Sequence, residues 1–227
     1  MNVLVTGASR GLGYWLAVEG ASRGHRVFAG VRSLSAAERF SAEKHAVVPV
    51  LLDVTDESSV EHAAETVRRD AGSLDVLVNN AAVLLARDVP IERLDIGDVR
   101  RTFEVNLFGP IVVVKQMLPL LERSVRPIVV NISSEAGSSA QAYGGDYPYA
   151  LSKAALNMFS IQLDRLFKPR GGRAISVHPG WIRTDMGGER APGDPADAAR
   201  RIWELIERGL PEVDPPFVGV DGRPMPL

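Results

Sequence analysis

Short apolar runs alternate with longer stretches of helical period along the whole chain. Strands that are apolar on both faces are typical of a parallel sheet covered by helices, and each intervening stretch is long enough for a crossover helix. The pattern predicts one α/β domain over residues 1–227, a doubly wound Rossmann-type fold with a mostly parallel sheet of about seven strands. Pro110 predicts a kink or break in the fourth helical stretch. The runs are NVLVTG, HRVFAGV, AVVPVLLDV, LDVLVNNA, RPIVVNISS, RAISVHPG and PPFVGV, and the helical stretches are 11–23, 35–44, 56–71, 95–122, 149–168 and 195–208.

Composition narrows the classes of function. The 227 residues carry a net charge of −2 and no run of basic residues, which argues against a nucleic-acid partner. The chain has no cysteine, and its histidines lack metal-ligand spacing, so we expect no metal site. The N-terminus lacks the pattern of a signal peptide, and no apolar stretch approaches the length of a membrane span, so we expect a cytoplasmic protein with no membrane partner. The histidines are His25, His45, His62 and His178.

The first apolar run is followed at once by TGASRGLG, which contains Gly7, Gly11 and Gly13. One glycine is enough for a tight turn between a strand and a helix, so three indicate that a ligand comes close to the backbone. At a strand-to-helix junction the usual ligand is a phosphate, because the free amides of the first helical turn point toward it. Taken alone, the loop is a weak signal that a simple turn would also explain.

The ligand crevice of a doubly wound sheet lies at the carboxyl ends of its strands. After the second run, AGVRS supplies Arg32 and no acidic residue, which favours the 2′-phosphate of NADP over the free ribose of NAD. Arg10 in the glycine loop is a second candidate cation, although either arginine could be a solvated surface charge. Asp53 could accept a hydrogen bond from adenine or cap a helix, and Asn79 and Asn80 could contact the cofactor or cap backbone groups.

A second cluster begins with Ser134 in NISSEAG and continues with Tyr149 and Lys153 in YALSK, which are four residues apart and share one face of a helix. Each residue is unremarkable alone, and the pair could be a surface contact. Together they provide a hydroxyl to hold a carbonyl oxygen, a phenol to donate a proton, and a cation to lower the pKa of the phenol. Moving that pKa from ~10 to roughly 7 needs about 4 kcal/mol. A nearby ammonium and a cationic nicotinamide can supply it in a partly dry site.

These motifs resemble the short-chain dehydrogenase/reductase family over nearly the whole chain, with TGASRGLG, NNAA, VNLFG and PGWIRT in the family's order. The resemblance implies that Ser134 orients the substrate, Tyr149 is the acid/base, and Lys153 activates the phenol and binds the ribose. It also implies that Asn106 holds a water in a proton relay, and that the loop after the sixth run holds the nicotinamide. The cofactor-binding residues expected on all these grounds are Gly7, Ser9, Arg10, Gly11, Leu12, Gly13, Arg32, Asp53, Val54, Asn80, Ala81, Tyr149, Lys153, Pro179, Gly180, Ile182 and Thr184.

Two features depart from the family pattern. Ala82 replaces a usual glycine, and the interval from Ser134 to Tyr149 is longer than is common, which leaves Ser133 as an alternative for the serine role. Within the family, HPGWIRTDMGG and the terminal DGRPMP resemble the small carbonyl-reductase-like branch of sniffer-type and C-factor-type proteins. Only ten residues separate Thr184 from Pro195, so we expect an open mouth to the site and loose substrate selection.

We interpret the chain as an NADP(H)-dependent oxidoreductase that reduces an aldehyde or ketone to an alcohol, or runs in reverse, with Tyr149 as the acid/base. The expected partner is a small carbonyl or alcohol substrate, and the family resemblance adds a homodimer or homotetramer. The alternative is a dinucleotide-binding regulatory or signalling protein that keeps the fold without relevant turnover. The intact set of Ser134, Tyr149 and Lys153 argues against that alternative.

Overall fold

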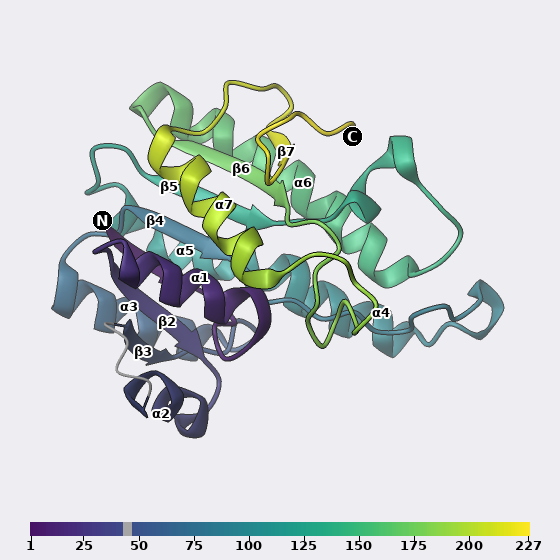
Figure 1. Cartoon of the computed structure of the whole chain (residues 1–227), viewed down its shortest axis with the longest axis horizontal. Helices are drawn as coiled ribbons and strands as arrows, with labels where there is room; N and C mark the ends of the chain where they lie inside the picture. The colour runs from purple at the N-terminus through teal and green to yellow at the C-terminus, as the bar shows by residue number, and fades with distance from the viewer. Residues whose placement is uncertain (43–46) are drawn as a thin grey trace.

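The computed structural model describes residues 1–42 and 47–227 (Figure 1). Its seven strands form one sheet in the order β3-β2-β1-β4-β5-β6-β7, and every neighbouring pair is parallel. The predicted fold class is confirmed, and the described sheet is parallel throughout rather than mostly so. The strands are β1 (Asn2–Val5), β2 (Arg26–Val31), β3 (Val47–Leu51), β4 (Val76–Asn79), β5 (Ile128–Ile132), β6 (Arg173–His178) and β7 (Phe217–Gly219).

Helices cover both faces of the sheet. Side chains of α1, α2 and α7 build one apolar core, and side chains of α3, α5 and α6 build the core on the opposite face. Figure 1 shows α1 and α7 side by side in front of the sheet. The helices are α1 (Gly11–Ser22), α2 (Leu34–Ala42), α3 (Glu57–Ala71), α4 (Ile96–Phe103), α5 (Gly109–Leu121), α6 (Tyr147–Phe167) and α7 (Pro195–Arg208). Short 3-10 helices add η1 (Ile91–Arg93), η3 (Glu135–Gly137), η4 (Ser139–Gln141) and η5 (Lys168–Arg170).

Some sequence expectations fall on residues 43–46, outside the described part of the chain. These are the end of the helical stretch 35–44, His45, and the start of the third apolar run at Ala46. The described part of that stretch is helical, and the described part of the run contains β3.

The helical stretch expected over 95–122 is broken in the middle, as Pro110 predicts. α4 passes into a π-helical segment, η2 (Glu104–Phe108), and α5 then begins with Pro110 in its first turn. Proline has no N–H, so it cannot donate to the carbonyl of Asn106 four residues earlier, and the chain widens there instead. By length and composition the continuous helical run Ile96–Leu121 could cross a membrane, which the sequence reading did not anticipate. Half of its apolar part is buried inside the domain, as in a core helix.

β1 and β4 are neighbours in the sheet, and the strand order reverses between them. The helices that follow these two strands lie on opposite faces of the sheet. A crevice for a ligand lies at such a switch point, outside the carboxyl ends of the strands. The residues that follow β1, β2, β4, β5 and β6 therefore meet at one edge of the sheet.

Candidate active site

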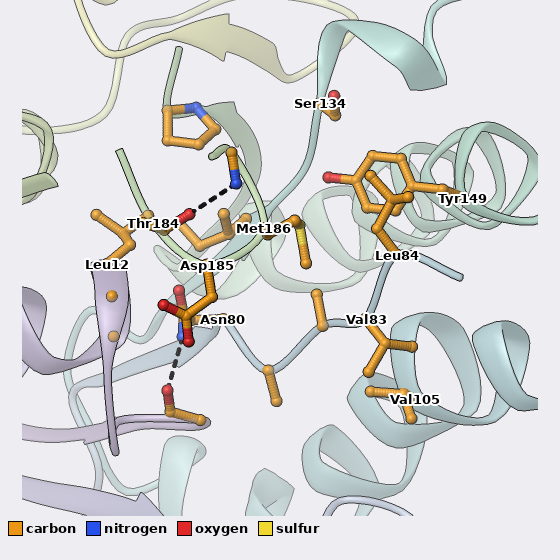
Figure 2. A pocket seen from close by; sticks show the side chains of 18 of the residues that line it. Leu12, Asn80, Val83, Leu84, Val105, Ser134, Tyr149, Thr184, Asp185 and Met186 are labelled. Atoms are coloured by element: carbon orange, nitrogen blue, oxygen red, sulfur yellow. Dashed lines mark hydrogen bonds between the residues drawn. The ribbon is translucent and has the colours of Figure 1, made fainter. Parts of the chain in front are cut away.

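A cavity of about 480 Å³ lies at the carboxyl ends of the strands (Figure 2). All the cofactor-binding residues expected from the sequence and Ser134 line it, whereas Asn106 and the weaker candidate Asn79 do not. The glycine loop and Arg32 belong to this cavity together with Ser134, Tyr149 and Lys153. Segments as far apart in the sequence as residues 7–13 and 179–184 thus face the same space.

Two features of the structure require glycine in the loop 7–13: positive φ angles and close packing against the chain after β4. Gly7 and Gly11 adopt positive φ angles of 65° and 55°, which side chains disfavour. A Cβ on Gly7 would lie 2.8 Å from the Cα of Ala81, and one on Gly13 would overlap the Asn80 side chain. Close packing inside the protein thus accounts for part of the pattern that suggested a nearby ligand.

The loop nevertheless leaves an anion site. Arg10 precedes α1 without capping it through its side chain, and the first turn of α1 contains no acidic residue. The first amides of the helix therefore keep unsatisfied donors, which favour a negatively charged group such as a pyrophosphate. The donor chemistry of this loop fits a dinucleotide.

Thr6 and Asn80 join the ends of β1 and β4. The Thr6 hydroxyl accepts from the amides of Asn80 and Ala81 at 3.0 and 3.1 Å, and the Asn80 side chain donates to the carbonyls of Thr6 and Gly7 at 3.0 and 3.2 Å. Asn79 instead points into the core, where its amide donates to Asn131. Of the two asparagines, only Asn80 therefore lines the cavity.

Arg32, Asp53 and Arg101 form a charged group at the far end of the cavity from Tyr149. Burial raises the pKa of Asp53, but hydrogen bonds from Thr55 and the charges of Arg32 and Arg101 outweigh it, so the pKa lies below its usual value. Asp53 does not cap α3, because Asp56 does so with hydrogen bonds to the amides of Ser58 and Ser59. Asp53 accepts from the amide and hydroxyl of Thr55 through one oxygen, Oδ1.

Ser134 and Tyr149 meet at the opposite end of the cavity, where Figure 2 shows the Tyr149 hydroxyl pointing into the open space. Burial raises the pKa of Tyr149 to about 12, and the polar Ser134 side chain acts in the opposite direction. Desolvation of the phenolate dominates here, and the lowering of this pKa that the sequence argument expects from an ammonium and a cationic nicotinamide stays a prediction. At neutral pH the phenol keeps its proton and can donate it.

Lys153 is buried between β5 and Tyr149. Its Nζ donates to the carbonyl of Ile132 at 2.7 Å and lies 5.5 Å from the centroid of the Tyr149 ring. Burial lowers the pKa of Lys153 to about 7. In this arrangement the amine is directed at the strand, so its expected activation of the phenol requires a reorientation or a further charge in the site.

The structure separates the two serines that the sequence left as alternatives. The Ser133 hydroxyl is buried and donates to the side-chain oxygen of Asn157 at 2.6 Å, whereas the Ser134 hydroxyl accepts from the amide of Ala136 at 3.2 Å and contributes to lowering the pKa of Tyr149. Asn157 also donates to the carbonyl of Gly137 at 3.2 Å, so it fastens the loop after β5 to α6. A Cβ on Gly137 would lie 2.7 Å from the Lys153 carbonyl carbon, which shows how closely this loop packs on the helix.

Asn106 lies behind the site rather than in it. Its side-chain oxygen accepts from the amide of Val83 at 2.9 Å, and its side-chain nitrogen donates to the Val83 carbonyl and the Ser152 hydroxyl at 2.9 and 3.0 Å. Both amide protons are therefore used in holding the chain after β4 against α6. A water at Asn106 would bind through the main-chain carbonyl, which Pro110 leaves without its usual helical donor. The relay role stays a prediction.

The segment after β6 is short, as the sequence indicates, but it reaches across the cavity. Arg10 forms an ion pair with Asp185, and Arg87 donates to the carbonyl of Met186 at 2.7 Å. The Thr184 hydroxyl accepts from the amide of Gly187 at 3.1 Å and fixes the turn between them. The contacts of Arg10 and Arg87 with this segment therefore cross the mouth of the cavity, which the sequence analysis expects to be open. Arg10, a candidate cation for the cofactor phosphate, is paired with Asp185 in this structure.

Several residues that line the cavity were missed by sequence reasoning. His178, at the end of β6, accepts a hydrogen bond from the amide of Glu135 at 3.3 Å. Its position at the carboxyl end of a strand was a usable signal. Arg87, Arg101 and Met186 lie in a loop, on a helix and in a turn, where strand ends give no guidance.

A Rossmann-type domain with an anion-binding glycine loop at one end of its crevice and a serine, a tyrosine and a lysine at the other has the architecture of a nicotinamide-dependent oxidoreductase. Residues 1–194 match the family model described as short chain dehydrogenase, and the chain belongs to that family.

Three similar proteins support the expected branch of the family. The protein named C-signal from Myxococcus xanthus is 36% identical over 156 residues, which are 68% of this chain and 93% of the relative. The NADPH-bound carbonyl reductase from chicken fatty liver superposes with a TM-score of 0.90 at 28% identity, covering 100% of this chain and 98% of that one. Carbonyl reductase Sniffer of D. melanogaster gives 0.90 at 27% identity, covering 100% and 99%.

Proposed function

We propose that this chain is an NADP(H)-dependent carbonyl reductase. The observation that carries the proposal is the placement of the Ser134 and Tyr149 hydroxyls and of Lys153 in the cavity that also holds the glycine loop and Arg32. The named activities of the chicken and Sniffer proteins add support from similarity.

Each end of the cavity has its part in binding. The amides at the start of α1 would hold the pyrophosphate, Arg32 would bind the 2′-phosphate, and the loop from Pro179 to Thr184 would bind the nicotinamide. The bound cofactor supplies a hydride for reduction of a carbonyl carbon.

Ser134, Tyr149 and Lys153 lie at one end of the cavity, here called the reacting end. The side chains at the reacting end position the substrate and move one proton. Ser134 donates a hydrogen bond to the carbonyl oxygen, and Tyr149 donates a second and then transfers its proton to that oxygen. A phenol with a pKa of about 12 holds this proton firmly before catalysis. A positive charge near the phenol, from a protonated Lys153 or the oxidised nicotinamide, would lower the cost of releasing it.

The alternative hypothesis is a dinucleotide-binding regulatory or signalling protein without relevant turnover. One observation favours it, the similarity to the protein named C-signal. The two readings differ in turnover, so a panel of aldehydes, ketones and quinones is tested with NADPH and with NADH. We expect oxidation of NADPH with several carbonyls and slower or weaker use of NADH. Tight NADPH binding without turnover of any carbonyl, or of any alcohol with NADP⁺, would favour the regulatory reading.

The cofactor preference is tested separately with Arg32→Ala. A charge-assisted hydrogen bond contributes roughly 1.5–3 kcal/mol, so the variant should bind NADPH about tenfold to hundredfold more weakly. Its affinity for NADH should change little, as should both affinities in the surface control Arg208→Ala. Equal weakening of NADPH and NADH by Arg32→Ala would contradict recognition of the 2′-phosphate.

A further inference from the structure

Arg87 is a cation beside the reacting end that has no part in the proposed transfer of the hydride and the proton. It lines the cavity and donates one Nη2 hydrogen bond, to the carbonyl of Met186 at 2.7 Å. Among the ion pairs that the described residues form, none includes Arg87. A guanidinium has five N–H donors, so most of its hydrogen-bonding capacity remains open to a ligand.

The backbone around Arg87 is strained. Within the described chain, the residues other than glycine with positive φ are Ala86, Asp88 and Asp146, at 54°, 57° and 45°. Two of them flank Arg87 directly, and the third immediately precedes α6. Such conformations cost roughly 1–3 kcal/mol each and cluster at functional sites, where the surrounding structure enforces them.

One contact couples the strained loop to the helix that carries Tyr149. The amide of Asp88 donates to Asp146 Oδ1 at 3.2 Å, and Asp146 Oδ2 accepts from the Tyr143 hydroxyl at 2.9 Å. Arg87 is therefore held at a defined place beside the start of α6. Burial raises the pKa of both Tyr143 and Tyr149, and the positive charge of Arg87 partly opposes this rise. The charge of Arg87 therefore reaches the end of the cavity that holds Tyr149.

Three acidic side chains that line this end of the cavity already have polar neighbours. Asp146 accepts the two hydrogen bonds above, and Asp185 is paired with Arg10. Glu135 lies 4.0 Å from the imidazole of His178. Arg87 thus remains the cation of this rim with donors to spare, and the planar guanidinium matches the geometry of a carboxylate.

We propose that Arg87 binds a carboxylate of the substrate, so that the preferred substrates are oxo acids, which are reduced to hydroxy acids. This inference rests on the proposed reductase function and names its substrate class. In the reaction a C–H bond forms with the hydride, the C=O π bond breaks, and the oxygen takes the Tyr149 proton. The carboxylate is unchanged, and the reduced cofactor is oxidised.

The test compares oxo acids with their neutral methyl esters at saturating NADPH. A series with increasing separation between carbonyl and carboxylate covers the unknown span from Tyr149 to Arg87. For the best acid, wild type should show a kcat/KM at least about tenfold above that of its ester, as expected for a partly exposed charge-assisted contact. Arg87→Gln should remove this preference, mainly by raising KM for the acid, while the ester changes less than twofold.

Two variants serve as references. Arg93→Gln removes the same charge from the neighbouring η1, outside the cavity lining, and should leave both substrates unaffected. Arg87→Lys keeps the charge without the bidentate fork and should retain part of the preference. The NADPH dissociation constant of each variant, expected to be unchanged, checks that the site is folded.

Three outcomes would overturn the inference. Equal use of acid and ester by wild type would show that no carboxylate is recognised. Equal loss with acid and ester in Arg87→Gln would assign Arg87 to holding the Met186 turn. If wild type binds NADPH but reduces neither acids nor esters nor any other carbonyl, the proposed function itself fails. Reduction of neutral carbonyls without a preference for acids leaves the proposed function standing and removes only the substrate class.

Discussion

Lys153 is a buried lysine whose amine is enclosed between β5 and the Tyr149 ring. Removing an ammonium from water favours the neutral form, which is why its pKa falls to about 7. Tyr149 shifts the other way for the same reason, since burial favours the protonated phenol. Burial therefore favours the neutral form of both residues.

This burial predicts a specific dependence of stability on pH. The folded-state pKa of Lys153 is depressed, so between pH 7 and about 10 the unfolded chain binds more protons, and the Lys153 contribution to stability rises with pH by roughly 1.4 kcal/mol per pH unit. Lys153→Met lacks this dependence. Without cofactor, the stability of the variant relative to wild type should fall as the pH rises from 7 to 9, measured by urea unfolding of both proteins. A difference independent of pH would show that Lys153 keeps an ordinary pKa.

At the scale of elements, the contact between α1 and α7 shows how a helix pair depends on one small residue. Trp203 of α7 is fully buried, and its Nε1 donates to the carbonyl of Leu16 at 2.9 Å. A Cβ on Gly20 of α1 would overlap the Trp203 ring. The sequence pattern predicts both helices but gives no indication of this contact, because the two residues are far apart in the chain.

Gly20→Ala should destabilise the protein although alanine is the better helix former. Overpacking a core typically costs about 1–3 kcal/mol, which exceeds the gain of up to ~1 kcal/mol in helix propensity. For a chain of this size Tm should fall by about 2–4 °C per kcal/mol, measured by thermal unfolding. Gly144→Ala is the matched control, because its added methyl would meet no atom within 4 Å. A Tm of Gly20→Ala at or above that of wild type would contradict the packing argument.

The sequence predicts features that local residues determine, and it misses features that depend on contacts between distant parts of the chain. The predicted bounds 195–208 match α7, whose ends are marked locally: Asp194 caps the first turn, proline starts the helix and glycine follows its end. Strand-end residues were placed in the cavity because parallel strands end at one edge. Arg87 was not, because its loop is fixed by tertiary contacts to Asp146 and Met186 that no local pattern encodes. The raised pKa of Tyr149 also depends on three-dimensional burial.

At the scale of the whole molecule, apolar side chains remain exposed on one side of the domain. They lie on η2, α5 and α6, where the π-helical segment packs against α6. Met158 and Leu166 are 57% and 45% exposed. The exposed residues are Phe108, Ile111, Leu151, Met158 and Leu166. Such a surface is consistent with the homodimer or homotetramer expected from the family resemblance, which stays a prediction.

The assembly prediction is tested by light scattering or sedimentation of wild type and of the double variant Met158→Glu with Leu166→Glu. We expect wild type to be a dimer or tetramer and the double variant to be smaller, because two carboxylates would be buried in the interface. Val125→Glu alters a side chain that is 89% exposed and lies outside these helices, so it should keep the wild-type mass. A monomeric wild type, or an unchanged double variant, would contradict assembly through this face.

The central claim, that this domain is a reductase with Tyr149 as its proton donor, is tested most directly by Tyr149→Phe. The substitution removes the hydroxyl and keeps the ring, so α6 and the glycine loop should remain in place. Two quantities are measured for wild type and variant: the NADPH dissociation constant, and kcat on the best carbonyl substrate. We predict an NADPH affinity within about twofold of wild type and a kcat lower by ~10²–10⁴, as expected for loss of a positioned general acid. Equal kcat values for the two proteins would contradict the account.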